Sequence, residues 1–119
     1  MEDEKRYNVL IRPVGRIQII EHDDSLDFYR SYIKGFIEIV RVHDDIVMVI
    51  DDEGKLKDLP VNILASWLYD CEDYIVGPAI LDKRQGPELI GLTHPEAIAE
   101  VMKLVRVMGE SIIMEEGVS

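Results

Sequence analysis

The chain has 119 residues, of which 47% are hydrophobic, and 24 acidic residues against 13 basic ones give a formal net charge of −11. This length suits a single domain over residues 1–119 with its own core, which excludes chain-wide disorder. An acidic surface repels phosphate, so we expect no direct nucleic-acid binding. The charge fits either a surface that only confers solubility or a face that binds a basic partner protein.

We expect a cytoplasmic protein. The single cysteine, Cys71, cannot form an internal disulfide, which is typical of a reducing compartment. No apolar run approaches the ~20 residues that cross a bilayer, and the N-terminal tail 1–6 is charged rather than apolar. The sequence therefore predicts no membrane association.

The first third of the chain predicts two strands and a helix. Residues 7–15 and 16–22 are rich in Val and Ile, with turn residues between them. Asp24 or Ser25 can cap a helix that continues to Gly35, where a left-handed C-terminal cap belongs.

The middle of the chain predicts a hairpin followed by a short helix. Residues 36–42 alternate between polar and apolar side chains, and residues 46–50 are apolar throughout, as in a strand covered on both faces. Gly54 is expected to give the following turn a positive φ. Residues 62–69 predict a helix whose N-cap is Asn62.

The last third predicts a strand, a loop and a longer helix. Because proline cannot donate a ladder hydrogen bond, the strand 73–81, which contains Pro78, is expected at a sheet edge or with a bulge. The loop 82–91 leads to a helix in which Thr93 and Glu96 have capping-box spacing. The expected apolar stripe of this helix consists of Ala97, Ile98, Val101, Val105 and Met108.

The C-terminal tail 110–119 is expected to fray or, through its apolar segment 112–114, to add a strand or contact another subunit. Strands and helices do not alternate strictly along the chain, and the hairpins are short. The sequence therefore predicts the α+β class, with a small mixed or antiparallel sheet of about five strands and two to three helices.

The triplet His-Asp-Asp occurs twice, at 22–24 and at 43–45. If the two turns met in space, their imidazoles and carboxylates could bind a divalent metal. Both triplets, however, fall where capping and turn residues are expected, and turn tips are poor scaffolds for metal ligands. We therefore expect no metal and no other cofactor.

Signals for catalysis are equally weak. Cys71 is flanked by Asp70, Glu72 and Asp73, whose charges disfavour a reactive thiolate. The sequence contains no nucleophile elbow, phosphate-binding loop or dinucleotide fingerprint, and the acidic turn at 51–54 lacks the spacing of a calcium loop. We expect that the protein is not an enzyme.

The segment from Gly54 to Asn62 contains the candidate ligand site. In an extended chain Lys55 and Lys57 would point to one side, because side chains alternate with a period of two, and Leu56 would point inward. These lysines would then lie just before a helix N-terminus, which favours anions. The predicted ligand-binding residues are therefore Gly54, Lys55, Lys57 and Asn62. A purely structural interpretation treats the lysines as solvated charges.

Three stretches of the sequence carry a family resemblance: GFIEIVRVHDDIVMVIDDEGKLKDLPVN, YIVGPAIL and LTHPEAIAEVMKLV. Together they resemble the domain-of-unknown-function family numbered 3846, over residues 9–107. Within the most specific part of the match, Asp58 stands where the family often has glycine, and Val61 stands where it often has a second proline. The resemblance implies no catalytic residues.

The resemblance implies a gene carried mainly by bacteriophages and other mobile elements, whose small acidic accessory proteins often act by binding. We therefore expect a non-enzymatic protein that binds a host protein through its acidic surface, with counter-defence as the implied role. The alternative is a protein that binds or sequesters a small anionic signal molecule, such as a nucleotide, at the segment from Gly54 to Asn62. A homo-oligomer is compatible with both.

Overall fold

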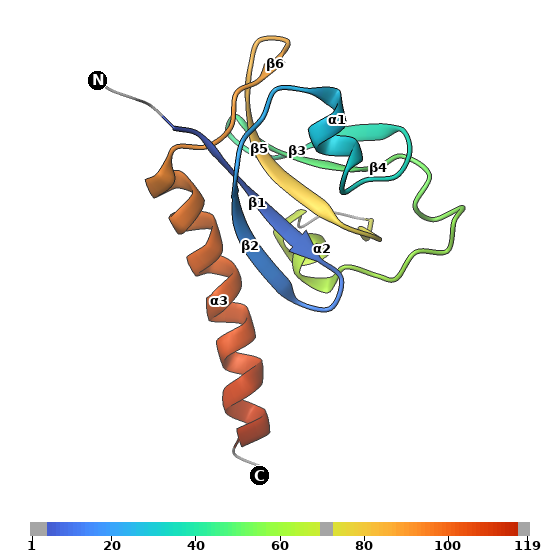
Figure 1. The fold of residues 1–119 in the computed structure, drawn as a ribbon. Coiled ribbons are helices and arrows are strands. Elements are labelled where there is room, and N and C mark those ends of the chain that lie inside the picture. The colour runs from blue at the N-terminus through green and yellow to red at the C-terminus, as the bar shows by residue number, and fades with distance from the viewer. Residues whose placement is uncertain (1–4, 70–72, 117–119) are drawn as a thin grey trace.

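The computed structural model describes residues 5–69 and 73–116. In this part of the chain, six strands form an antiparallel sheet and three helices pack on it, which confirms the α+β class (Figure 1). The elements in chain order are β1 (Tyr7–Arg12), β2 (Arg16–Glu21), α1 (Leu26–Arg30), β3 (Ile37–His43), β4 (Ile46–Asp51), α2 (Ile63–Tyr69), β5 (Ala79–Gln85), β6 (Glu88–Leu89) and α3 (His94–Glu116).

The strand order is β2-β1-β5-β4-β3, with β6 paired to β5. β5 is therefore central, hydrogen-bonded to β1 and β4, and the predicted edge position is wrong. The reason is where the strand begins: Pro78 precedes Ala79, so the missing N–H of the proline lies outside the ladder. The predicted loop is also wrong, because β5 continues to Gln85 and turns back into β6.

Helices cover both faces of the sheet. Val9 and Leu81 point to the face that packs against α2 and α3, whereas Leu10 and Ile80 point to the face that packs against α1. Figure 1 shows α1 and α3 on opposite sides of the strands. Since both faces are covered, the apolar run of β4 is buried along its whole length, as the sequence predicts.

The predicted helix caps are present. The Ser25 hydroxyl accepts a hydrogen bond from the first turn of α1, and the Asn62 side chain does the same for α2. Thr93 and Glu96 form a reciprocal capping box at the start of α3, with donor–acceptor distances of 2.8 and 3.3 Å. Short polar side chains thus set where each helix begins.

The predicted positive φ angles at Gly35 and Gly54 are wrong, because the left-handed residues of the described chain do not include them. These glycines instead allow close packing. A Cβ on Gly54 would lie 2.7 Å from Val76, and one on Gly35 would lie 2.7 Å from the Lys57 ammonium. The left-handed position in the segment is Asp58, with φ 60°, where the resembled family often has glycine.

α3 continues to Glu116, through the C-terminal segment that was predicted to fray, add a strand or contact another subunit. Its expected single apolar stripe is also divided. Ala97 is fully buried against the sheet, whereas Ile98 and Val105 are 40% and 45% exposed. No described helix combines the length and the apolar character needed to cross a membrane.

Asn62→Ala is expected to lower the free energy of unfolding by about 3 kcal/mol. The Asn62 amide is fully buried and donates to the carbonyl oxygens of Ile11 and Gly77, while its own oxygen caps α2. Truncation leaves all three bonds unmade. Urea denaturation measures the loss.

Ser25→Ala is the matched control, because it removes a cap that is exposed to solvent, and it is expected to lose only about 1 kcal/mol. A loss from Asn62→Ala no larger than that of the control would contradict the structural role of the buried amide.

Candidate functional site

The segment from Gly54 to Asn62 is folded into turns rather than extended. Backbone N–H groups of Lys57 and Leu59 donate to the carbonyl oxygens of Glu53 and Gly54. As a result Leu56, which was expected to point inward, is 87% exposed. The period-of-two argument therefore does not apply to the two lysines, and the structure sends them to different partners.

Lys57 connects its turn to the loop before β3. Its ammonium donates to a carboxylate oxygen of Asp51 and to the carbonyl oxygen of Lys34, both at 2.7 Å, and it lies against Gly35. The Asp51 side chain is only 3% exposed. Lys57 thus compensates a buried carboxylate.

Lys55 lies elsewhere, in an ion pair with Asp73 and 4.2 Å above the ring of Tyr74. It lines a small hollow of about 270 Å³ together with Gly54. The same hollow is lined by four carboxylates, those of Glu38, Asp51, Asp52 and Asp73.

Of the four predicted ligand-binding residues, the structure brings only Gly54 and Lys55 together at this hollow. Lys57 bonds Asp51, and Asn62 is fully buried as a helix cap. The role of this segment in ligand binding stays a prediction, but the surrounding carboxylates disfavour an anion there.

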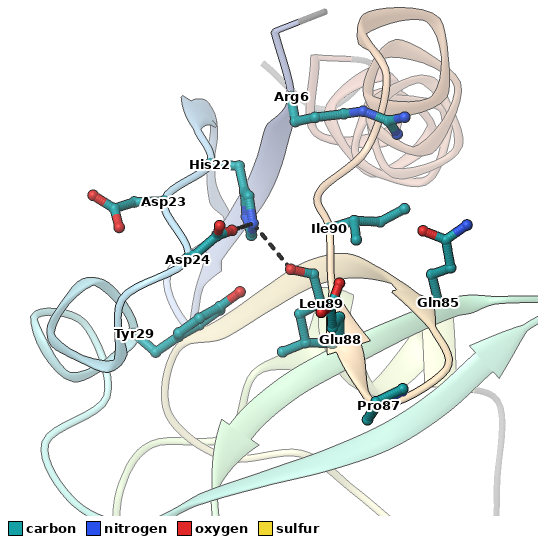
Figure 2. Close-up of a pocket in the computed structure, with 10 residues that line it drawn as sticks. All are labelled: Arg6, His22, Asp23, Asp24, Tyr29, Gln85, Pro87, Glu88, Leu89 and Ile90. Atoms are coloured by element: carbon teal, nitrogen blue, oxygen red, sulfur yellow. Dashed lines mark hydrogen bonds and ion pairs between the residues drawn. The ribbon is translucent and has the colours of Figure 1, made fainter.

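A larger groove of about 950 Å³ opens between the loop after β2 and the β5–β6 hairpin (Figure 2). His22, Asp23, Asp24 and Tyr29 line one side, and residues 85 and 87–90 line the other. Arg6 lies at one end, where its guanidinium donates to the Gly91 carbonyl oxygen at 3.3 Å. The two sides are distant in the chain, so only the fold brings them together.

A buried carboxylate, Asp82, lies beneath this groove. One of its oxygens accepts hydrogen bonds from the backbone N–H groups of Lys83 and Gly91, at 2.8 Å each. The other accepts the hydroxyl of Tyr29 at 2.6 Å. Three donors thus compensate a carboxylate that has no solvent-exposed surface.

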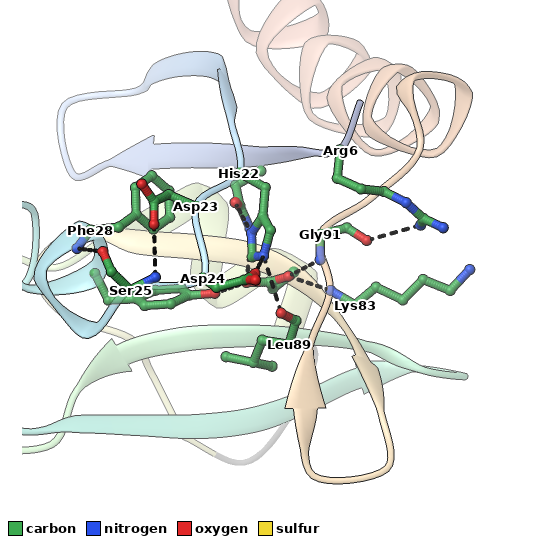
Figure 3. A network of polar contacts seen from close by, with 12 residues as sticks. Arg6, His22, Asp23, Asp24, Ser25, Phe28, Lys83, Leu89 and Gly91 are labelled. Atoms are coloured by element: carbon green, nitrogen blue, oxygen red, sulfur yellow. Dashed lines mark hydrogen bonds and ion pairs between the residues drawn. The ribbon is translucent and has the colours of Figure 1, made fainter. Parts of the chain in front are cut away.

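His22 links the carboxylate to both sides of the groove (Figure 3). Its Nδ1 faces the amide oxygen of Asn8 at 2.8 Å, and its Nε2 faces Asp24 at 2.9 Å and the Leu89 carbonyl at 3.1 Å. All three neighbours are acceptors, because Asn8 directs its NH₂ group to Leu81. The ring that satisfies them carries a proton on both nitrogens.

The positive imidazole that this bonding pattern favours has a buried counter-charge nearby, since Nδ1 lies 3.9 Å from Asp82. The ring is held tightly: a Cβ on Gly91, whose φ is 78°, would lie 2.8 Å from His22. The base of the groove is therefore closely packed and hydrogen-bonded throughout.

Burial, and then the hydrogen bond to Asp82, raise the pKa of the Tyr29 hydroxyl well above its ordinary value. Tyr29 therefore remains a donor at every physiological pH. In contrast, hydrogen bonds from the backbone and side chain of Ser25 hold the pKa of Asp23 below its ordinary value. The groove thus keeps a neutral phenol inside and a charged carboxylate at its rim.

The rim is mainly acidic. Asp23, Asp24 and Glu88 face solvent, and Arg6 and His22 are the basic residues among those that line the groove. The Asp24 side chain is 89% exposed although it contacts His22. Such a rim can accept hydrogen bonds from a cation, while the packed base fixes the distance between the two sides.

The two His-Asp-Asp triplets do not form a common site. His22 belongs to the groove, whereas His43 bonds Glu100 of α3 at 2.9 Å. Among the described residues, no group of three or more potential ligands is arranged to hold a metal ion. Cys71 lies outside the described residues.

The sequence did not indicate the groove, because Asp82, the carboxylate beneath it, falls in the predicted loop 82–91. Asn8 and Asp82 lie two residues beyond the paired Leu10 and Ile80, on the same face of β1 and β5. The signal available in the sequence was a polar residue at a position that shares a strand face with buried apolar side chains. For Asp82 this signal can be recognised only once β5 is known to extend past Leu81.

The fold and this groove define a class: a small α+β protein in which helices cover both faces of an antiparallel sheet, with an acidic-rimmed groove over a buried polar network. A comparison with known protein families identifies the family. The chain belongs to the family described as a domain of unknown function, DUF3846, whose model matches residues 7–106. No curated protein and no solved structure matches the chain significantly.

Tyr29→Phe is expected to lower the free energy of unfolding by about 1–3 kcal/mol at neutral pH, because the buried Asp82 loses a donor. The substitution should also remove the decrease in the free energy of unfolding that the ionisation of Tyr29 causes at alkaline pH. The folded pKa is raised, so the unfolded tyrosine ionises first. The wild-type stability from this group is therefore complete below about pH 10 and falls by about 1.4 kcal/mol per pH unit above it.

Urea denaturation at several pH values measures both effects. Tyr74→Phe, at a residue that is 51% exposed, controls for the loss of a hydroxyl and is expected to change neutral-pH stability by less than about 0.5 kcal/mol. An unchanged alkaline slope in Tyr29→Phe would show that the phenol is not held by the network.

Proposed function

We propose that the protein is a non-enzymatic binding module whose groove between the loop after β2 and the β5–β6 hairpin receives a basic side chain of a partner protein. The observation that carries the proposal is the combination of an acidic rim with a packed, buried base in a groove of about 950 Å³. The net charge of −11 favours the same class of partner through long-range attraction.

The bonding of the groove supports binding rather than catalysis. A general base needs an accessible lone pair, and a nucleophile needs an activating neighbour. In the described structure the imidazole of His22 faces acceptors on both nitrogens, and Asp82 accepts on both oxygens. The hydroxyl of Tyr29 donates to Asp82 and is held protonated. These bonds leave none of the three groups free to attack or deprotonate a substrate.

The rim can distinguish a cation from an anion. At the exposed rim, Asp23, Asp24 and Glu88 contribute three negative charges against the positive charge of Arg6, while the imidazolium of His22 lies below the rim beside Asp82. A guanidinium placed between the rim carboxylates of the two sides could donate to both, because its planar donors suit carboxylate geometry. An arginine-containing segment is therefore the partner chemistry that we favour.

A phage or mobile-element origin, a host protein as the partner, and a counter-defence role are the finer form of this proposal. They rest on what the family resemblance in the sequence implies and on the acidity of the chain, since the family itself is described as a domain of unknown function. The alternative, sequestration of a small anionic signal at the segment from Gly54 to Asn62, has less support, since Lys55 and Lys57 pair with Asp73 and Asp51. A homo-oligomer stays a prediction.

Asp24→Asn combined with Glu88→Gln is expected to weaken binding of an arginine-containing peptide about tenfold, because the rim loses a carboxylate on each side. NMR titration measures the affinity, and the largest shifts should fall on the backbone amides of residues 22–24, 85, 86 and 88–90. The wild-type affinity should also decrease with added salt.

Asp52→Asn combined with Asp58→Asn is the matched control, since it also removes two negative charges, but from an exposed turn outside the groove. It should weaken binding much less. Equal weakening by both double variants, or shifts centred elsewhere, would reduce the effect to general acidity. A nucleotide that raises the thermal midpoint of the protein, with shifts near Lys55, would favour the alternative instead.

A further inference from the structure

The His22 ring lies where the exposed rim of the groove meets its buried base. The side chain of His22 is only 6% exposed, yet its Nε2 contacts Asp24, whose side chain is 89% exposed. The Leu89 carbonyl, on the opposite side of the groove, also lies within reach of Nε2 (Figure 3). This nitrogen therefore borders the space in which a partner's cation is proposed to bind.

The two ring nitrogens differ in how freely their surroundings can change. The acceptor at Nδ1 is fixed, because Asn8 has no exposed surface and its NH₂ group donates to the Leu81 carbonyl at 2.8 Å. Nδ1 must therefore keep its proton. At Nε2, by contrast, the exposed Asp24 can turn toward another donor. Nε2 is the nitrogen that can give up a proton, provided that a new donor takes its place.

A guanidinium can supply that replacement. It has five N–H donors in one plane, enough to reach the Asp24 carboxylate and the Nε2 lone pair of a neutral ring together. A positively charged imidazole in the same position would repel the guanidinium. The neutral tautomer with a proton on Nδ1 therefore suits the occupied groove, and the doubly protonated ring suits the empty one.

The charges around the ring favour one cation in either state. Asp24 faces the ring from the loop after β2, and Asp82 faces it from β5. Tyr29, from α1, lies beside the ring and stays neutral. Arg6, before β1, is at the end of the groove, where it bonds the Gly91 carbonyl. The two facing carboxylates thus have the imidazolium as their counter-ion until another cation arrives.

We infer that a basic partner displaces the Nε2 proton of His22, so that the groove exchanges a proton for the partner's cation. The inference rests on the proposed function of the groove. The proton passes from Nε2 to solvent, and the partner is held by hydrogen bonds and ion pairing without any covalent bond. Because the two cations compete, affinity for the partner rises with pH, by at most about tenfold per pH unit for the release of one proton.

Calorimetry of an arginine-containing peptide binding to the full chain tests the exchange between about pH 5 and about pH 8. The affinity should increase with pH over this range. Near its acidic end, the heat of binding should differ between two buffers of different ionisation enthalpy, because the released proton is taken up by the buffer. The difference gives the number of protons released, which should approach one.

NMR of the ring nitrogens tests the same step in the wild-type protein without any substitution. In the free protein, at the acidic end of the range, both nitrogens of His22 should be protonated. In the complex at the same pH, only Nδ1 should carry a proton. His43, which bonds Glu100 outside the groove, is the internal control, and its ring should not change on binding.

His22→Gln removes the exchangeable proton and should make the affinity independent of pH over this range. His43→Gln is the matched control, because it makes the same change at a histidine that does not line the groove. It should leave the pH dependence intact. Circular dichroism establishes that both variants are folded, and the ring NMR of the wild type decides the question should His22→Gln unfold.

The outcomes separate this inference from the proposed function. Peptide binding with an affinity independent of pH, or a His22 ring that stays doubly protonated in the complex, would overturn the exchange and leave the binding groove in place. A peptide that does not bind at any pH would remove the proposed function, and the exchange with it.

Discussion

The structure depends on one buried carboxylate. Asp82 lies in the central strand of the sheet with no exposed surface. The free-energy cost of an uncompensated charge there would be prohibitive. Its compensation connects distant segments: Tyr29 from α1, Gly91 from the segment before α3, and His22 from the end of β2. These bonds hold α1, the β5–β6 hairpin and the loop after β2 in fixed relative positions, and the groove is the space that remains between them.

The same physical constraint recurs at Asp51, another buried acid. Asp51, at the end of β4, is compensated by Lys57, whose ammonium also reaches the Lys34 carbonyl and lies against Gly35. A lysine that resembles a ligand-binding residue in the sequence therefore fastens two turns together. Excess negative charge at the surface and individually compensated acids inside are compatible, because only the buried ones require donors.

Covering the sheet on both faces also limits where the proposed partner could bind. α1 and α3 occupy opposite faces, so the strand faces themselves are not available. The groove lies beyond them, beside the β5–β6 hairpin, and there the polar network of the interior comes close to solvent through His22 and Asp24. His22 thus connects the buried Asp82, which the fold must compensate, to the exposed Asp24, which would attract a basic partner.

Local chemistry in the sequence determined much of the fold: the α+β class, most strands, and the caps at Ser25, Asn62 and Thr93, because alternation and capping act over a few neighbouring residues. It also indicated the family. Only the tertiary structure decided that β5 is central, that Lys57 compensates Asp51, and that Asp82 lies beneath a groove. Those facts depend on which distant segments meet, and the burial that makes a carboxylate demand a tyrosine 53 residues away exists only after the chain has folded.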